Sequence, residues 1–283
     1  MHNVPLPICT IEDVLTACIA NMHTSRREAF IDAYPQIISR SNEYVQAGQA
    51  GRLFSFPQET AVTARIGRKQ MENLYKNQFR RTSFYADLFD GGNGRCTICS
   101  ERDTQTLDHY LPQSKYAPLT VTSANLLPTC FTCNNRKSNH TPAPSSTMPI
   151  HPYFDNIDNI PWLNAQYEKS DPIAFKFFVD VPNVINAFGA TEVCKGKKLA
   201  SKIETTFHAH KLGEFYAVKA AEEISNLDGY FCHPKSNQPQ NEIECRFQNE
   251  VERFGTNYWK AVLYKTLLYD TWYLDNLLRK STR

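Results

Sequence analysis

Apolar residues first recur at helical spacing in residues 10–21. The repeat of three and four residues is typical of one buried helix face. The residues that carry it are Ile11, Val14, Leu15, Cys18 and Ile19. Thr10, just before this run, and Asp13, within it, resemble a capping box, in which each side chain accepts a hydrogen bond from the backbone N–H of the other residue. We therefore expect an amphipathic helix over residues 10–21.

Two further helical stretches follow the first. The second helix of the chain begins at Ser25, and Pro35 predicts an interruption or a restart of it, because proline lacks an N–H and clashes with the preceding turn. It fades near Gly48 and Gly51, where small residues break the pattern. A third helix is predicted over residues 59–79.

The C-terminal part alternates towards β-structure over residues 174–181 and then becomes helical. Helices are predicted over residues 197–226, 241–253 and 256–279. The last one has a wide apolar face. This face consists of Trp259, Val262, Leu263, Thr266, Leu267, Tyr273, Leu274 and Leu277. Such a face is buried, either in the core of the protein or against a partner.

The centre of the chain differs in composition from both ends. Residues 90–94 read Asp-Gly-Gly-Asn-Gly, which is typical of a turn. Residues 138–152 hold four prolines and three serines, too many helix breakers for a helix interior. We therefore expect an α+β protein in three parts. These are a helical N-terminal region at 1–90, a compact module with a Pro-rich strap at 91–155, and a mainly helical region at 156–283.

Composition limits the class of protein without identifying it. The 283 residues are 41% hydrophobic, which is enough for a sizeable core, and the net charge of +2 neither favours nor excludes a nucleic-acid partner. No run approaches the roughly 18 apolar residues of a membrane span, and the first residues lack a signal-peptide pattern. We expect a soluble, cytoplasmic protein with no membrane partner.

Four of the nine cysteines form two Cys-x-x-Cys pairs, Cys96 with Cys99 and Cys130 with Cys133. Two such pairs supply the four thiolates of a closed tetrahedral zinc site. The alternatives are chance or redox chemistry, although a redox motif needs only one pair. A zinc ion without an open position is structural, so we expect it to stabilise the fold and to take no part in the reaction.

The residues between and beside the cysteine pairs carry a second pattern. It reads Leu-Asp-His-Tyr-Leu-Pro at 107–112, Asn-Leu-Leu-Pro at 125–128 and Cys-Asn-Asn-Arg-Lys at 133–137. In order and spacing this pattern resembles the HNH nuclease family. The resemblance covers about 45 residues by motif, and it implies a ββα-metal fold, a β-hairpin followed by a short helix, stapled here by the cysteines.

The resemblance also implies roles for individual residues. His109 matches the general base, Asp108 and Asn134 match the ligands of a catalytic Mg²⁺ or Mn²⁺, and Asn125 matches the residue that braces the loop and orients the histidine. Asn134 stands where the family name has a histidine, and the family accepts asparagine there. His140, in the strap, is a rival ligand.

The same roles suit the chemistry of phosphodiester hydrolysis. Histidine has the unperturbed pKa nearest neutrality, so His109 can take a proton from water. A hard divalent cation held by a few oxygen ligands neutralises the charge that develops on the leaving oxygen. Asp108 and Asn134 offer a carboxylate and an amide oxygen, a sparse set of the kind that Mg²⁺ tolerates.

Basic residues outside the motif suggest contacts with nucleic acid. Arg136 and Lys137 follow Asn134 and can reach a phosphate, or they are solvated surface charges. A second group comes from the predicted third helix and its end. It consists of Arg65, Arg68, Lys69, Lys76, Arg80 and Arg81. With Tyr75, Phe79, Phe84 and Tyr85 interleaved or adjacent, this group can grip a backbone and stack bases, or it is a solvated helix face.

The leading hypothesis is a metal-dependent endonuclease with DNA as the favoured substrate. An RNA-cutting version of the same site is a rival, and so is a zinc ribbon that binds nucleic acid or protein without cutting it. The layout is similar to the stand-alone HNH proteins of bacterial anti-phage systems of the Septu and retron types, which work beside a separate ATPase. That similarity implies an ATPase partner, in keeping with the lack of a phosphate-binding Gly-x-x-x-x-Gly-Lys-Ser/Thr loop in this sequence.

Overall fold

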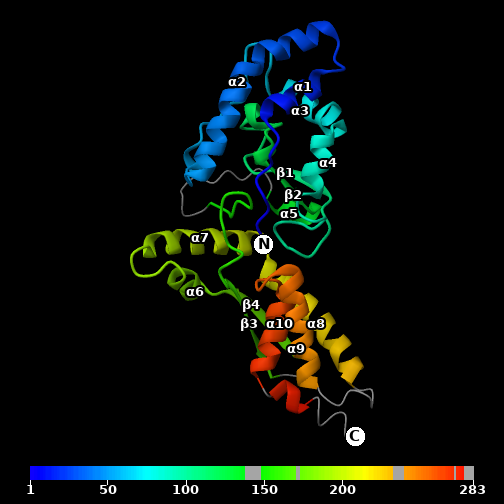
Figure 1. Cartoon of the computed structure of the whole chain (residues 1–283), viewed down its shortest axis with the longest axis vertical. Coiled ribbons are helices and arrows are strands. Elements are labelled where there is room, and N and C mark those ends of the chain that lie inside the picture. The colour runs from blue at the N-terminus through cyan, green and yellow to red at the C-terminus, as the bar shows by residue number, and fades with distance from the viewer. Residues whose placement is uncertain (138–147, 170–172, 232–238, 271, 277–283) are drawn as a thin grey trace. The chain divides into compact units, whose positions relative to one another are not determined.

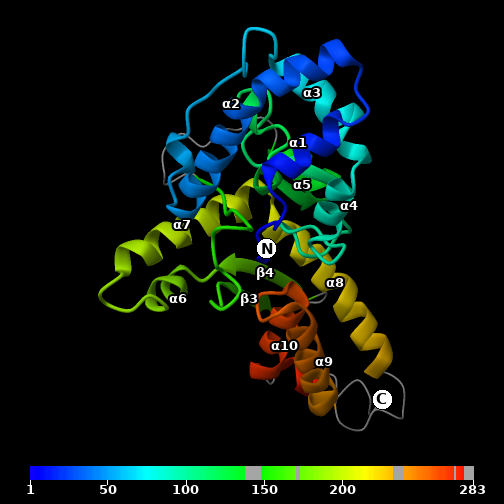
Figure 2. The ribbon, with the colours of Figure 1, turned by 45° about the horizontal axis from the view of Figure 1, so that its top comes forward.

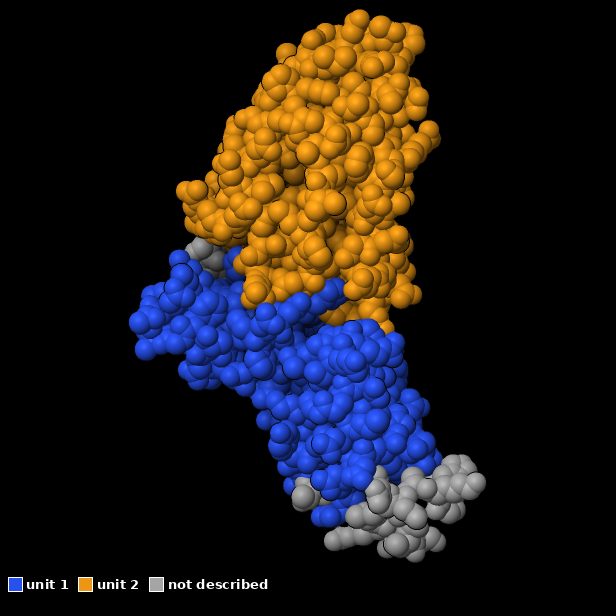
Figure 3. All heavy atoms as spheres, in the orientation of Figure 1, with its two compact units in different colours: residues 1–2, 157–283 blue, residues 3–156 orange. Residues whose placement is uncertain are grey.

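The computed structural model describes residues 1–137, 148–169, 173–231, 239–270 and 272–276. The chain divides into two compact units, one of residues 3–156 and one of residues 157–283 with residues 1–2 (Figure 3). Among the described residues helices predominate and two small sheets have two strands each, so the fold class is α+β. None of the described helices is both long enough and apolar enough to cross a membrane.

The N-terminal unit surrounds a small β-hairpin with helices (Figures 1 and 2). Its first four helices are α1 (Ile11–Ile19), α2 (Thr24–Gln49), α3 (Arg68–Asn77) and α4 (Ser83–Asp90). Its short 3-10 turns are η1 (Leu53–Ser55), η2 (Phe79–Arg81), η3 (Ala117–Leu119) and η4 (Ser123–Asn125). The hairpin strands are β1 (Thr106–His109) and β2 (Leu126–Thr129), followed by α5 (Phe131–Lys137).

Helix α1 begins as predicted. Thr10 Oγ1 accepts a hydrogen bond from the Asp13 N–H at 3.1 Å, and the Asp13 side chain bonds back to the Thr10 N–H. The five apolar residues of the predicted face are all buried. They join a core that α1 shares with α2, α3 and the hairpin.

The predicted interruption or restart of the second helix at Pro35 is wrong, because α2 runs through that residue without a break. Pro35 is exposed, so the carbonyl that loses its helical partner can bond to water instead. The buried residues Ala33 and Ile37 lie on either side of it and hold one continuous face against the core. The helix ends just before Gly51, whose φ of +64° suits glycine.

Helix α3 is shorter than predicted, since residues 59–67 are not helical. Glu59 pairs with the loop before η3, donating its N–H to Lys115 O at 2.9 Å and accepting from the Ala117 N–H at 2.7 Å. These backbone bonds with a distant segment replace the helical ones. Gly67 then forms the N-cap, and its N–H donates to Gln70 Oε1 at 3.2 Å.

The C-terminal unit packs helices against a second hairpin. Its strands are β3 (Leu163–Glu168) and β4 (Ala174–Val179), which pair antiparallel. Its helices are α6 (Val181–Asn186), α7 (Val193–Ala209), α8 (Leu212–Phe231), α9 (Pro239–Phe254) and α10 (Trp259–Tyr269). The predicted helix 197–226 is in fact two helices, because Lys211 has a φ of +50° and turns the chain between α7 and α8.

The predicted last helix, 256–279, is also shorter, since α10 ends at Tyr269 and residues 272–276 are helical again after it. The described apolar positions of the predicted face are buried, apart from the half-buried Thr266. Helix α10 contacts α8, α9 and β3 of its own unit. The face is therefore core and does not form an open docking surface. Leu277 lies outside the described residues.

Candidate functional site

The four paired cysteines meet in one cluster. Sγ atoms of Cys96, Cys99, Cys130 and Cys133 all lie within 4.8 Å of one another, and all four residues are buried. Backbone N–H groups support the sulfurs: Arg102 N–H points at Cys99 Sγ at 3.5 Å, and the Cys133 N–H points at Cys130 Sγ at 3.4 Å. This arrangement fits one tetrahedral metal ion.

The pKa values of the four thiols also favour a bound metal cation. Hydrogen bonds among the thiols lower the pKa of Cys99, with Cys130 as the largest contributor. They also lower the pKa of Cys130 to about 6, mainly through Cys133. Hydrogen bonding to Cys130 raises the pKa of both Cys96 and Cys133. Complete ionisation of four adjacent thiols therefore needs a positive charge between them, which zinc supplies.

The hairpin and α5 bring together the residues of the second pattern. In the antiparallel register Asp108 lies opposite Leu127 and His109 opposite Leu126. Asp108, His109 and Asn134 all border one cavity of about 560 Å³, which is called here the His109 cavity. The resemblance to the HNH family implied that these three residues share a site, and here they border the same cavity.

His109 has a defined hydrogen-bonding state in this cavity. Its Nε2 lies 2.8 Å from the carbonyl oxygen of Thr120, which can only accept a hydrogen bond. Nε2 must therefore carry the proton, and Nδ1 of the neutral ring is left with a free lone pair. Burial lowers the pKa of His109 to about 4. The ring is thus neutral near pH 7, and in the folded chain without a bound substrate it is a weaker base than a free histidine.

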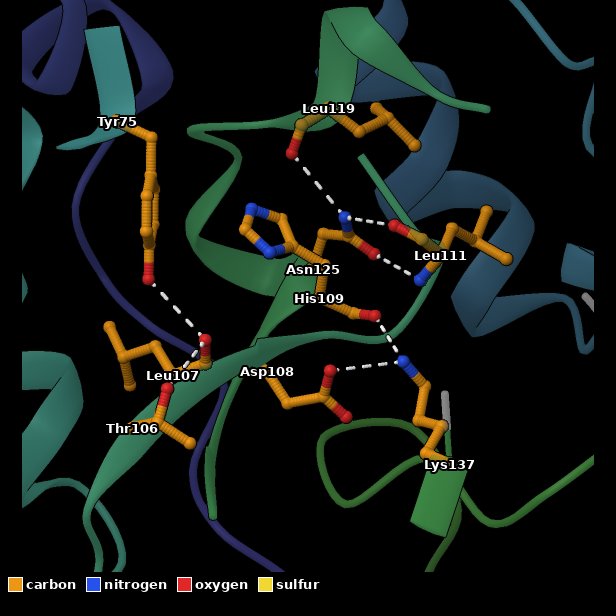
Figure 4. A network of polar contacts seen from close by, with 9 residues as sticks. All are labelled: Tyr75, Thr106, Leu107, Asp108, His109, Leu111, Leu119, Asn125 and Lys137. Atoms are coloured by element: carbon orange, nitrogen blue, oxygen red, sulfur yellow. Dashed lines mark hydrogen bonds and ion pairs between the residues drawn. The ribbon is translucent and has the colours of Figure 1, made fainter. Parts of the chain in front are cut away.

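Asn125 braces the loop around this histidine (Figure 4). Its Oδ1 accepts from the Leu111 N–H at 2.8 Å, and its Nδ2 donates to Leu111 O at 3.0 Å and to Leu119 O at 3.3 Å. Leu119 immediately precedes Thr120, the residue that accepts from His109 Nε2. The amide of Asn125 therefore fixes the backbone that orients the imidazole.

Lys137 makes a contact that the motif did not predict. Its Nζ lies 3.1 Å from Asp108 Oδ1, and it also donates to the His109 carbonyl oxygen (Figure 4). Both side chains are nearly buried, 12% exposed for Lys137 and 9% for Asp108. Burial raises the pKa of Asp108, and the ammonium opposes that shift. The carboxylate of this site therefore already has a cationic partner.

The predicted basic residues separate in space. Arg80 borders the His109 cavity and lies over the Tyr85 ring at 5.7 Å. Arg68 pairs with Glu72 at 2.6 Å, while Arg65 and Lys69 border a different cavity. Three other predicted residues border neither the His109 cavity nor the cavity that Arg65 and Lys69 line. These are Lys76, Arg81 and Arg136.

The aromatic residues of the basic stretch do not form a base-stacking surface as a group. Phe79 is fully buried. Tyr75 packs its ring against His109, with the ring centroids 4.9 Å apart, and donates its hydroxyl to Leu107 O at 3.3 Å. These two contacts hold Tyr75 in place beside the imidazole. Phe131 was not singled out from the sequence, yet it borders the His109 cavity with 56% of its surface exposed.

His151 has a structural position, as the sequence suggested. It is buried, its Nε2 lies 2.9 Å from Tyr44 Oη, and its ring packs at 4.2 Å against Tyr110. Tyr153 follows it and donates its hydroxyl to Leu126 O at 2.8 Å. These aromatic residues seat the end of the strap on the core. His140 and the rest of residues 138–147 lie outside the described residues.

Comparison with known proteins gives two partial similarities. The chain is 28% identical over 198 residues to "Protein ea31" of Escherichia phage lambda, which covers 64% of this chain and 67% of that protein. It is 34% identical over 78 residues to "Septu protein PtuB" of Bacillus thuringiensis, covering 25% of this chain and 29% of that protein. No family model matches the chain. No solved structure matches it either.

Proposed function

We propose that this protein is a metal-dependent endonuclease of the HNH type that hydrolyses phosphodiester bonds. The observation that carries the proposal is the hydrogen bond from His109 Nε2 to Thr120 O, which leaves Nδ1 unprotonated in a histidine that borders the His109 cavity. A neutral imidazole with a free lone pair is what a general base needs in order to take a proton from water. The lowered pKa of His109 keeps it in that state at neutral pH.

The oxygen atoms beside His109 suit a hard divalent cation. Asp108 and Asn134 border the same cavity and offer a carboxylate and an amide, and substrate phosphate can complete such a set. A bound Mg²⁺ or Mn²⁺ would supply charge stabilisation at the phosphate and leaving oxygen. For Asp108 to hold it, the Lys137 ammonium must move away from the carboxylate or share it.

The groups around the cavity suit a phosphate-rich substrate. Arg80 and Lys137 provide cations at the rim of the cavity that His109 borders, and Gln105 and Asn135 provide amide donors. Contacts of this kind hold a backbone without reading its sequence. DNA is the favoured substrate, and RNA remains the alternative, since every one of these groups can hold either backbone.

We further propose a role in anti-phage defence beside an ATPase. The support is the partial similarity to the Septu protein PtuB, together with the similarity of layout to stand-alone HNH defence proteins. The apolar face of α10 is buried in its own unit, so an ATPase would have to dock on another surface.

The test is a cleavage assay on supercoiled and linear DNA and on RNA, with Mg²⁺, with Mn²⁺ and without either. His109→Ala should lower the rate about a hundred- to ten-thousand-fold, the usual cost of losing a general base. His151→Ala is the matched control, since His151 is a buried histidine outside the cavity. Metal-independent cutting, or an unchanged rate in the His109 variant, would contradict the proposal. Binding without any cutting would favour the non-catalytic zinc ribbon.

A further inference from the structure

A second cavity borders helix α3 in the N-terminal unit. Its volume is about 420 Å³, and it lies between α3, the start of α2 and the loop before α3. Its polar lining residues are Arg26, Arg65, Lys69, Gln70, Asn73, Asn77 and Gln78. It is called here the α3 groove. Three cations and four carboxamides dominate its polar lining.

The α3 groove is separate from the His109 cavity. Lys69, Asn73 and Asn77 are spaced by four residues and so share one face of α3. Tyr75 packs against His109. At 100° per residue, the Tyr75 side chain points about 160° away from those of both Asn73 and Asn77 around the helix axis. A ligand in the α3 groove therefore occupies the opposite side of the helix from the proposed reaction.

The groove carries positive charge that the described residues do not neutralise. Arg26 and Lys69 have no ion-pair partner in the part of the chain that the structure describes. Arg65 pairs with Asp32 at 3.3 Å, but both side chains are more than half exposed, so the pair is weak and easily exchanged. None of the described lining residues is a carboxylate. The groove is therefore suited to an anion.

The carboxamides make the groove more specific than a patch of charge. Asn73, Asn77 and Gln78 have no side-chain hydrogen bond to any described residue. Gln70 uses its oxygen to accept from the Gly67 N–H, which leaves its NH₂ group available. Each carboxamide offers a donor and an acceptor in one plane, the pattern that pairs with the edge of a nucleobase.

A buried apolar floor keeps these polar groups in position. Phe30, Ile66 and Leu74 lie beneath the groove and are at most 2% exposed. The volume is within the range of about 300–1,000 Å³ that small-ligand sites usually have. The rim is open, since Arg26, Lys69 and Asn73 are exposed. A nucleotide can therefore enter either alone or as part of a strand.

We propose that the α3 groove is a binding site for a nucleoside phosphate. Arg26, Arg65 and Lys69 hold the phosphate, and the carboxamides of α3 hold the base or the sugar. The source of the ligand is either a free nucleotide or one nucleotide of a nucleic-acid strand, because both present the same groups. This site adds a second point of nucleotide recognition to the protein.

The experiment is isothermal titration of the full chain without divalent cations, so that no cutting occurs and the result does not depend on nuclease activity. The ligands are inorganic phosphate, adenosine, the mono- and triphosphates of adenosine and guanosine, and a short DNA strand. Arg26→Ala/Lys69→Ala should weaken binding of the phosphorylated ligands at least about tenfold, since hydrogen bonds to charged groups are strong. Adenosine, which lacks the phosphate, should bind far more weakly than its phosphates.

Two further variants separate a built site from general charge. Asn73→Ala/Asn77→Ala should weaken the binding of nucleotides but leave that of inorganic phosphate unchanged. Arg27→Ala is the matched control, because Arg27 is an exposed cation next to Arg26 that borders neither cavity, and it should bind as the wild type does. Binding of mononucleotides identifies a free ligand, and binding of the strand alone identifies a substrate contact. Equal losses in the Arg27 control, or no saturable binding of the mononucleotides or of the strand below about 1 mM, would overturn the proposal.

Discussion

The ammonium of Lys137 lies 3.1 Å from Asp108 Oδ1 and also donates to the backbone carbonyl of His109. It therefore holds two oxygens at the position where the motif predicts a metal ligand. A buried carboxylate needs a positive partner, and in this structure the partner comes from one turn beyond Asn134 on the same short helix. Lys137 and a divalent cation should therefore compete for the Asp108 carboxylate.

Lys137→Met should destabilise the protein by about 3 kcal/mol, because it leaves the buried Asp108 carboxylate without a partner. Added Mn²⁺ should restore part of that stability and should bind the variant more tightly than the wild type. Chemical unfolding with and without Mn²⁺, and titration of Mn²⁺ by its paramagnetic resonance signal, measure the two effects. In the control Asp108→Asn/Lys137→Met, most of the stability should return without Mn²⁺. Tighter Mn²⁺ binding by the wild type would contradict competition between the two cations.

Cys130→Ser should abolish the tight binding of about one zinc ion per chain and markedly lower the melting temperature, because a structural metal supplies folding energy. Elemental analysis and thermal unfolding are the measurements. Cys194→Ser is the matched control, since Cys194 is exposed and lies outside the cluster. A zinc-free Cys130 variant with wild-type stability would rule out a structural role for the metal.

The stability of the protein should fall below pH 6.5 in part because of His109. Burial lowers its folded-state pKa to about 4, so below pH 6.5 the unfolded chain takes up a proton that the folded protein does not. The stabilising contribution is complete above the unfolded pKa and is lost as pH falls towards 4. Between about pH 7 and about pH 5.5 it amounts to about 1 kcal/mol. Between these two pH values the free energy of unfolding of His109→Gln should fall by about 1 kcal/mol less than that of the wild type. Equal falls in the two proteins would contradict a lowered pKa of His109 in the folded state.

Gly48→Ala should destabilise the N-terminal unit although alanine is the better helix former. A Cβ at Gly48 would lie 2.2 Å from the ring of Phe154, which packs directly on the α2 backbone. The expected loss is about 1–3 kcal/mol, as for other overpacked sites. Gly229→Ala, in α8 with nothing within 4 Å of a new Cβ, should instead be neutral or raise stability slightly. Chemical unfolding measures both.

Trp259→Ala should cost about 3–5 kcal/mol, because the side chain is buried in the core of the C-terminal unit. Deleting residues 256–283 should unfold that unit, which limited proteolysis would detect. Tyr269→Ala is the control, since Tyr269 is on the same helix and is 82% exposed. A stable truncated protein that no longer responds to an ATPase would instead favour docking through this segment.

The sequence by itself determined the features that depend on local spacing. The capping box and apolar repeat of α1 follow from bonds and contacts between residues three or four apart, which sequence periodicity records directly. The two Cys-x-x-Cys pairs likewise predicted the cysteine cluster, because each pair places two thiols on one tight turn. That Asp108, His109 and Asn134 belong to one site was implied by the resemblance to the HNH family, and the structure places them around one cavity.

Tertiary structure decided what depends on distant neighbours. Pro35 stays within a helix because the apolar residues around it are buried by other elements, and residues 59–67 leave the helix because Glu59 finds backbone partners near η3. The protonation state of His109 depends on a carbonyl eleven residues away, and the charge of Asp108 on an ammonium 29 residues away. The sequence lists these groups, but only the folded chain brings them within bonding distance, and burial then makes each contact strong enough to determine the chemistry.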